Sequence, residues 1–102
     1  MARIIEVRHP KTCPSSLHLK VGDMLVFSAT GGHIREGDQG VQFLGAYCTA
    51  AIATDGNIIA PAGTPNHAIF LAHTPGNAVI DVVTGDPWRA FDTTRLALII
   101  EA

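Results

Sequence analysis

The chain has five histidines that could serve as metal ligands: His9, His18, His33, His67 and His73. A zinc site needs three or four ligands that converge on one ion. His67 and His73 would share one face of an extended strand, but six residues of strand span roughly 20 Å, so these two cannot hold the same ion. His33 lies in a glycine-rich stretch, and no spacing connects it with either of them. We therefore expect no metal site and no cofactor.

The residue pattern gives no better support for hydrolytic chemistry. Ser15, Ser16 and Ser28 do not occur in the glycine-flanked turn that presents a nucleophilic serine, and the glycine motifs that bind nucleotides are absent from the sequence. Cys48 lies within the apolar run GAYCTAAIA, where we expect a small core residue rather than a nucleophile. We expect that the chain is not an enzyme.

The only tryptophan, Trp88, follows Pro87 in the stretch TGDPWRAFDTT. Glycine, aspartate and proline at this point predict a loop. An amphipathic aromatic side chain at a loop tip offers a large contact area at little entropic cost, which favours a binding role. The alternative is that the indole folds back onto the rim of the domain and shields the core. The sequence leaves both open.

Short β-strands are the elements that would position these residues. Apolar residues alternate or form short blocks between turn residues, a pattern typical of β-sandwiches and barrels, and helical periodicity is lacking. We expect strands at residues 3–7, 16–20, 24–29, 41–54 with a break near Gly45, 57–60, 66–73, 78–84 and 94–101. The stretch GGHIREGDQG at residues 31–40 has four glycines in ten residues, which predicts a flexible loop.

Strand alternation gives the sheets two different faces. One face is wholly apolar, with residues such as Phe70, Ile80 and Leu98, and is expected to form the core. The other face also carries aliphatic residues where a solvated sheet would be polar: Ile69, Leu71, Val79, Val83 and Ile99. We expect this second face to pack against another copy in a homo-oligomer. Isolated surface aliphatics are the alternative.

Length and charge set broad limits on the protein. The 102 residues predict one domain, 1–102, and the net charge of −2 gives no electrostatic reason to bind nucleic acid or an anionic membrane. No basic segment leads into a long apolar run, so we expect a cytoplasmic chain, or a periplasmic or secreted one if a signal has been removed. In a cytoplasmic chain Cys13 and Cys48 would be buried thiols.

The second half of the chain carries short motifs in a characteristic order. These are PAGTP at residues 61–65, Phe70 with Ala72, a Pro-Gly pair at 75–76, an apolar strand at 78–83, Pro87 with Trp88, and a last strand at 96–102. In this order and spacing the chain resembles the chagasin family, the Ig-like β-sandwich inhibitors of papain-like cysteine proteases. The early run LKVGDMLVF is similar to the second strand of that family.

The resemblance implies a fold and a mode of binding. The fold is an all-β, two-layer antiparallel β-sandwich, Ig-like or chagasin-like, of about eight strands with no substantial helix. In the family, three loops at one end of the sandwich form a wedge that fills a protease cleft, and the loop with the Pro-Trp pair is one arm. The central family loop, which reads Asn-Pro-Thr-Thr-Gly-Tyr, is replaced here by SATGGHIREGDQG, in which Thr30 and Gly31 are the matching remnant.

The leading hypothesis is therefore a small binding module, with a cysteine protease as its protein partner. The residues expected to bind the partner are Thr30, Gly31, Gly32, His33, Gly63, Thr64, Pro65, Asp86, Pro87, Trp88 and Arg89. One alternative is a cupin-like barrel that binds a metal or small ligand through His33 and His67, because IIAPAGTPNHAIF is similar to the second cupin motif. Another is an oligomeric interaction protein of unknown ligand.

Overall fold

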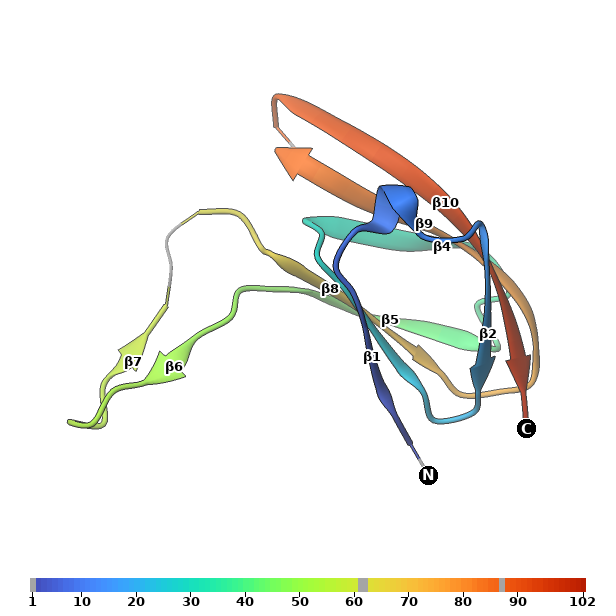
Figure 1. The fold of residues 1–102 in the computed structure, drawn as a ribbon, viewed down its shortest axis with the longest axis horizontal. Coiled ribbons are helices and arrows are strands. Elements are labelled where there is room, and N and C mark those ends of the chain that lie inside the picture. The colour runs from blue at the N-terminus through green and yellow to red at the C-terminus, as the bar shows by residue number, and fades with distance from the viewer. Residues whose placement is uncertain (1, 61–62, 87) are drawn as a thin grey trace.

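The computed structural model describes residues 2–60, 63–86 and 88–102. Two four-stranded sheets pack face to face, and a two-stranded hairpin projects from one end of the sandwich (Figure 1). The elements are β1 (Ile4–Val7), the 3-10 helix η1 (Pro10–Thr12), β2 (Ser16–Lys20), β3 (Met24–Phe27), β4 (Gly31–Glu36), β5 (Val41–Tyr47), β6 (Ala51–Ile52), β7 (Ile58–Ile59), β8 (His67–Ala72), β9 (Gly76–Asp86) and β10 (Ala90–Glu101). The expected all-β sandwich is confirmed, since eight strands build its two sheets.

Each sheet has an antiparallel centre and one parallel edge. The first sheet has the order β1-β3-β8-β5 and the second the order β2-β10-β9-β4. The edge strand β1 runs parallel to β3, and the edge strand β2 runs parallel to β10, which differs from the expected antiparallel arrangement. The reason is that the chain passes from β1 to β2 in the opposite sheet before it returns as β3, so that β1 and β3 point the same way (Figure 1).

The core lies between the two sheets and contains every second residue of the central strands. Phe70 is wholly buried, and its ring packs against Phe27 at 5.7 Å and Phe43 at 4.9 Å between centroids. Ile80 and Leu98 of the second sheet belong to the same core cluster and are also wholly buried. The predicted core face is therefore confirmed. No helix among the described residues is long and apolar enough to cross a membrane.

The first six residues of the glycine-rich stretch at 31–40 form a strand and not the flexible loop that we expected, and residues 37–40 connect it to β5. Gly31–Glu36 form β4, which pairs antiparallel with β9 at the edge of the second sheet. Gly32 is needed there because a Cβ atom would stand 2.8 Å from Cζ of Phe70 and 2.9 Å from the backbone oxygen of Asp81. The glycine allows β4 to pack closely on the core, so its lack of a side chain is a packing requirement rather than a sign of flexibility.

The predicted break near Gly45 is a β-bulge. The register between β5 and β8 shifts between Phe43 and Gly45, and Gly45 has a φ of +134°. The strand nevertheless continues to Tyr47, and Cys48 lies just beyond it as an exposed residue, so the expectation that Cys48 is a core residue was wrong.

The strands β9 and β10 are both longer than expected and extend as far as the turn that carries Trp88.

A buried carboxylate holds the turn between β2 and β3. Asp23 is wholly buried, and its Oδ1 and Oδ2 accept hydrogen bonds from Nε and Nη2 of Arg3 at 3.0 and 2.6 Å. The backbone amide of Lys20 donates to Oδ2 at 2.8 Å. The hydrogen bonds from Arg3 are the largest cause that lowers the pKa of Asp23 to about 2, against the opposing effect of burial. The pair therefore ties the start of the chain to this turn.

The aliphatic residues expected to form one oligomer face do not share a surface. Ile69 and Leu71 lie on β8 in the first sheet, whereas Val79, Val83 and Ile99 lie on β9 and β10 in the second sheet. Each alternates with buried core residues, so the two groups point outward from opposite sides of the sandwich. The expected single face is corrected to two separate surfaces, and a homo-oligomer stays a prediction.

Candidate functional site

Three connections between strands meet at the end of the sandwich from which the small hairpin projects. They are the β3–β4 turn at residues 28–30, the part of the β7–β8 connection at residues 63–66, and the β9–β10 turn that follows Asp86. A hollow of about 330 Å³ is lined by the first two connections and by the end of β9: Ser28, Ala29, Thr30, Thr64, Pro65, Asn66, Thr84 and Gly85. We call these three connections, together with the β6–β7 hairpin, the loop end.

Hydrogen bonds hold the connections of the loop end in place. The hydroxyl of Thr30 donates to the backbone oxygen of Gly85 at 2.8 Å. The backbone amide of Thr30 donates to the backbone oxygen of Val83 at 2.9 Å. The amide of Asn66 donates to the backbone oxygen of Tyr47 at 3.0 Å, which anchors the return of the chain into β8. The two contacts of Thr30 fix the β3–β4 turn against the end of β9, from which the β9–β10 turn begins.

The β9–β10 turn presents Trp88 to solvent. Gly85 has a φ of +88°, and a Cβ atom on it would stand 2.7 Å from the backbone oxygen of Ala90, so the turn requires glycine there. A side-chain oxygen of Asp86 accepts a hydrogen bond from the amide of Trp88 at 2.9 Å. The Trp88 residue is 88% exposed, and Phe91 beside it is 59% exposed. This exposure excludes the alternative in which the indole shields the rim of the core.

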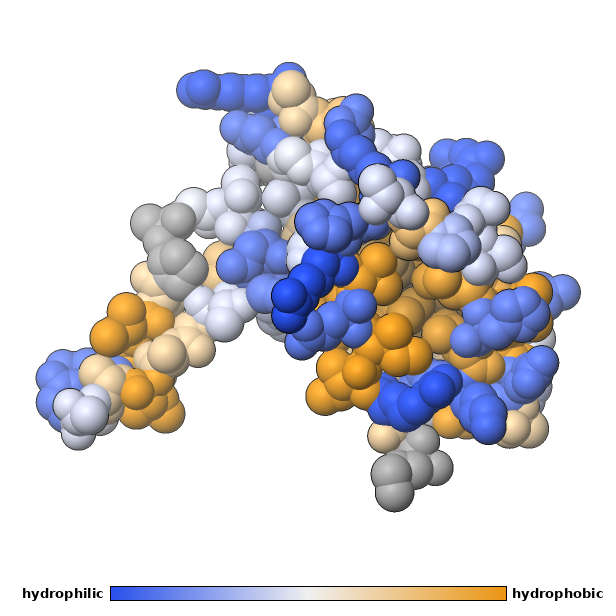
Figure 2. Space-filling view, in the orientation of Figure 1, coloured by the Kyte–Doolittle hydropathy of each residue, from blue (hydrophilic) through white to orange (hydrophobic). Residues whose placement is uncertain are grey.

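The β6–β7 hairpin is an apolar projection that the sequence analysis missed. Its two short strands extend away from both sheets (Figure 1), and Ile52, Ile58 and Ile59 are each more than half exposed. Figure 2 shows these apolar side chains gathered on the projection, apart from the apolar area around β1. The sequence signal was present as aliphatic residues on both sides of the TDGN turn, a pairing typical of a β-hairpin.

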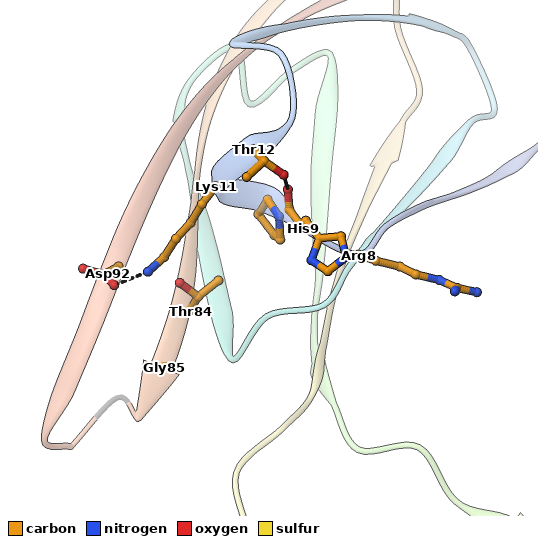
Figure 3. A pocket seen from close by; sticks show the side chains of 8 residues that line it. Arg8, His9, Lys11, Thr12, Thr84, Gly85 and Asp92 are labelled. Carbon is orange, nitrogen blue, oxygen red and sulfur yellow. Dashed lines mark hydrogen bonds and ion pairs between the residues drawn. The ribbon is translucent and has the colours of Figure 1, made fainter.

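A second hollow of about 400 Å³ lies beside the β9–β10 strands, where η1 approaches them (Figure 3). Lys11 on η1 forms an ion pair with Asp92 on β10. The side chain of Thr84 lies at this hollow, and its buried hydroxyl oxygen finds no hydrogen-bond partner among the residues that the structure describes. Thr84 and Gly85 line both hollows, so they form the wall between them.

The structure brings together some of the residues that we expected to bind a partner. Thr30, Thr64 and Pro65 line the loop-end hollow, Asp86 ends β9 beside it, and Gly63, Trp88 and Arg89 lie in the connections around it. Pro87 lies outside the described residues. Gly31, Gly32 and His33 belong to β4 instead, and His33 points out from the sheet, with Nε2 at 3.0 Å from Oδ2 of Asp81.

The two histidines of the cupin-like alternative do not converge. His33 lies on β4 in the second sheet and His67 on β8 in the first. The Nδ1 atom of His67 lies 2.7 Å from Oδ1 of Asn66 and 2.9 Å from Oγ1 of Thr49. Within residues 2–60, 63–86 and 88–102, no three His, Cys, Asp or Glu side chains are grouped so that they could hold a metal ion.

Cys13 and Cys48 are both free thiols, in different surroundings. Cys13 follows η1, and its Sγ donates to the backbone oxygen of Pro10 at 3.2 Å. Partial burial raises the pKa of the Cys13 thiol, which keeps it protonated and weakens it as a nucleophile. Cys48 lies near the loop end, where its Sγ donates to the backbone oxygen of Thr64 at 3.6 Å.

The fold is similar to that of two solved structures. The cysteine protease inhibitor EhICP2 from Entamoeba histolytica matches with a TM-score of 0.58 and 11% sequence identity, over 98% of this chain and 97% of its own. Amebosin matches with a TM-score of 0.51 and 11% identity, over 95% of this chain and 97% of its own. No family model and no curated protein matches the sequence. At this identity the likeness shows the fold.

Proposed function

We propose that this chain is a protein inhibitor of papain-like cysteine proteases, and that its loop end binds in the protease cleft. The observation that carries the proposal is the position of Trp88, which is 88% exposed on the turn after β9, and the end of β9 lies next to two other connections. The resemblance to the chagasin family in sequence and the likeness in fold to a cysteine protease inhibitor point to the same class of partner.

The loop end has the shape that an elongated cleft would require. The β6–β7 hairpin projects well beyond the sheets, and the turns at Thr30 and Trp88 lie at the same end (Figure 1). The β3–β4 turn lies between the projecting hairpin and the β9–β10 turn, so the three elements can contact a cleft side by side (Figure 1). We therefore assign the β3–β4 turn as the middle arm, and the β6–β7 hairpin as an outer arm together with residues 63–66.

The chemistry of the arms suits a protein interface. Interface centres are enriched in aromatic residues and depleted of charge, and a few such side chains supply most of the binding energy. Trp88, Phe91 and the isoleucines of the hairpin provide apolar area that is exposed in the unbound chain. The hydrogen bonds from Thr30 to Gly85 and from Trp88 to Asp86 order two of the arms in advance, which lowers the entropic cost of binding.

Inhibition assays with a matched pair of variants test the proposal. Ile58 on the hairpin and Ile4 on β1 are 73% and 72% exposed, so that truncation of either removes a similar exposed side chain. The unmodified chain should inhibit a papain-like protease but not a trypsin-like serine protease. Ile58→Ala should weaken inhibition about tenfold, while Ile4→Ala should leave it unchanged. Equal effects of the two variants, or no inhibition of any papain-like enzyme, would contradict the proposal.

A further inference from the structure

The outer face of the second sheet contains a buried carboxylate beneath three basic side chains. Asp81 on β9 points outward between β4 and β10, yet it is wholly buried. Its Oδ2 forms an ion pair with Nε of Arg35 and lies 3.0 Å from Nε2 of His33, and its Oδ1 lies 3.4 Å from Nε of Arg95. The side chains of these three residues therefore cover Asp81 and converge on it from both neighbouring strands.

The cluster has more positive than negative charge. Both arginines remain charged at neutral pH, and Asp81 supplies the single carboxylate among the described residues that line the hollow. Glu36 follows Arg35 in sequence, but no ion pair connects it with either arginine within the described part of the chain. One carboxylate thus compensates only one of the two guanidinium groups.

The arginines also retain hydrogen-bond donors. Each turns its Nε toward Asp81, and no hydrogen bond of the terminal nitrogens of Arg35 or Arg95 is found among the described residues. A guanidinium has five N–H donors in a rigid fork, of which the terminal four match the oxygens of a carboxylate or phosphate. Asp81 therefore holds two forks beside one another with most of their donors unused.

We propose that this cluster is a binding site for a small oxyanion of the size of phosphate. The site is a hollow of about 450 Å³ lined by His33, Arg35, Asp81, Thr93 and Arg95. The terminal nitrogens of Arg35 and Arg95 donate to the anion, and the hydroxyl of Thr93 supplies a further donor. Asp81 is a positioning residue, because its charge orients the two arginines and does not itself contact the anion.

The site is separate from the proposed protease-binding surface. It lies on the outward face of β4, β9 and β10, whereas the loop end is formed by the connections beyond the strands. The two proposals can therefore fail independently. The geometry favours a tetrahedral dianion over a monocarboxylate, because two forks can donate to different oxygens of one phosphate group.

A titration of the full chain with inorganic phosphate at constant ionic strength tests the site. The signals to follow by NMR are the Nε–H groups of Arg35 and Arg95 and the backbone amides of β4, β9 and β10. We expect saturable shifts confined to these signals, and weaker binding of acetate. Shifts that grow linearly without saturation, or that spread over the whole chain, would overturn the proposal.

Variants separate a built site from general electrostatic attraction. Arg95→Gln should weaken phosphate binding about tenfold, because it removes one charged donor group. Lys20→Gln removes the same charge from the same sheet, at a position paired with Glu101 and six residues along β10 from Arg95, and should have little effect. Equal effects of the two variants would contradict the site.

A third variant covers the case in which Arg95→Gln fails to fold because Asp81 loses a partner. Arg95→Lys keeps the charge but lacks the planar fork, so the protein should fold and bind phosphate several-fold more weakly than the unmodified chain. Unchanged phosphate affinity in Arg95→Lys would overturn the role of the guanidinium forks.

Discussion

The hydroxyl of Thr30 donates a hydrogen bond to the backbone oxygen of Gly85 at 2.8 Å, and this contact joins the β3–β4 turn to the end of β9, 55 residues further along the sequence. Thr30 follows β3 of the first sheet, while Gly85 precedes the turn that carries Trp88. The same hydroxyl lies 3.2 Å from the backbone oxygen of Val83. Thr30 thus determines how the β3–β4 turn sits against the β9–β10 turn, and with it the relative position of two proposed arms.

Replacement of Thr30 by valine should loosen this arrangement. The variant keeps the shape of the side chain but leaves the Gly85 oxygen without its donor, so we expect a loss of roughly 1 kcal/mol in the free energy of unfolding. Inhibition should weaken several-fold because the arms are less ordered before binding. Urea denaturation and inhibition assays measure the two effects, and Thr30→Ser should preserve both. Full stability and potency in Thr30→Val would refute this role.

Truncation of Trp88 should separate binding from stability. Because Trp88 is 88% exposed, Trp88→Ala should change the free energy of unfolding by less than about 0.5 kcal/mol. Inhibition should weaken by about tenfold or more, since buried tryptophans are common hot spots of interfaces. Trp88→Phe should retain part of the potency. An inhibition constant unaffected by Trp88→Ala would remove this turn from the interface.

Gly32 and Gly31 offer a paired test of how β4 packs. A Cβ atom on Gly32 would stand 2.8 Å from Cζ of Phe70, whereas on Gly31 the nearest contact is 3.9 Å from Cβ of Val83. Gly32→Ala should therefore lower the free energy of unfolding by about 1–3 kcal/mol through overpacking. Gly31→Ala should change it by less than about 0.5 kcal/mol. Equal midpoints of thermal unfolding in the two variants would contradict the close approach of β4 to Phe70.

The Arg3–Asp23 pair should make the free energy of unfolding depend on pH in the acidic range. The pKa of Asp23 is lowered from 3.8 to about 2 in the folded chain, so the stabilisation is fully present above the unfolded value and is lost as the pH falls toward 2. Asp23→Asn should therefore be less stable than the unmodified chain at pH 7, and the difference should shrink between about pH 5 and pH 2. Urea denaturation across this pH range measures the difference. Asp38→Asn removes the same charge from an exposed residue and is the control variant. A difference between Asp23→Asn and the unmodified chain that stays constant with pH would show that the carboxylate charge is not what stabilises the turn.

The core of the fold could be predicted because its signal is local. Strand alternation around Phe70, Ile80 and Leu98 identifies the buried face without knowledge of the partner strands, and the structure confirms it. The position of the Trp88 turn follows from turn residues next to one another in sequence. In both cases a few adjacent residues carry the information.

Other features depend on contacts between distant parts of the chain. Four glycines in ten residues predicted a loop at residues 31–40, but the reason for Gly32 is the ring of Phe70 on another strand. The pairing of Asp23 with Arg3 and the convergence of Arg35 and Arg95 on Asp81 require the tertiary fold. In the sequence, Ile52, Ile58 and Ile59 have the pattern of ordinary strand residues. Only the structure places them on a projection away from both sheets.

Binding to a protease with an open or an occupied cleft tests the central claim most directly. The chain would be titrated into a papain-like enzyme in active form, and into the same enzyme after a covalent peptide label has filled its cleft. The loop-end account predicts competitive inhibition of the active enzyme, with a raised KM at unchanged kcat, and binding to the labelled enzyme weakened at least tenfold. Equal affinity for both forms, or no effect on the active enzyme, would contradict it.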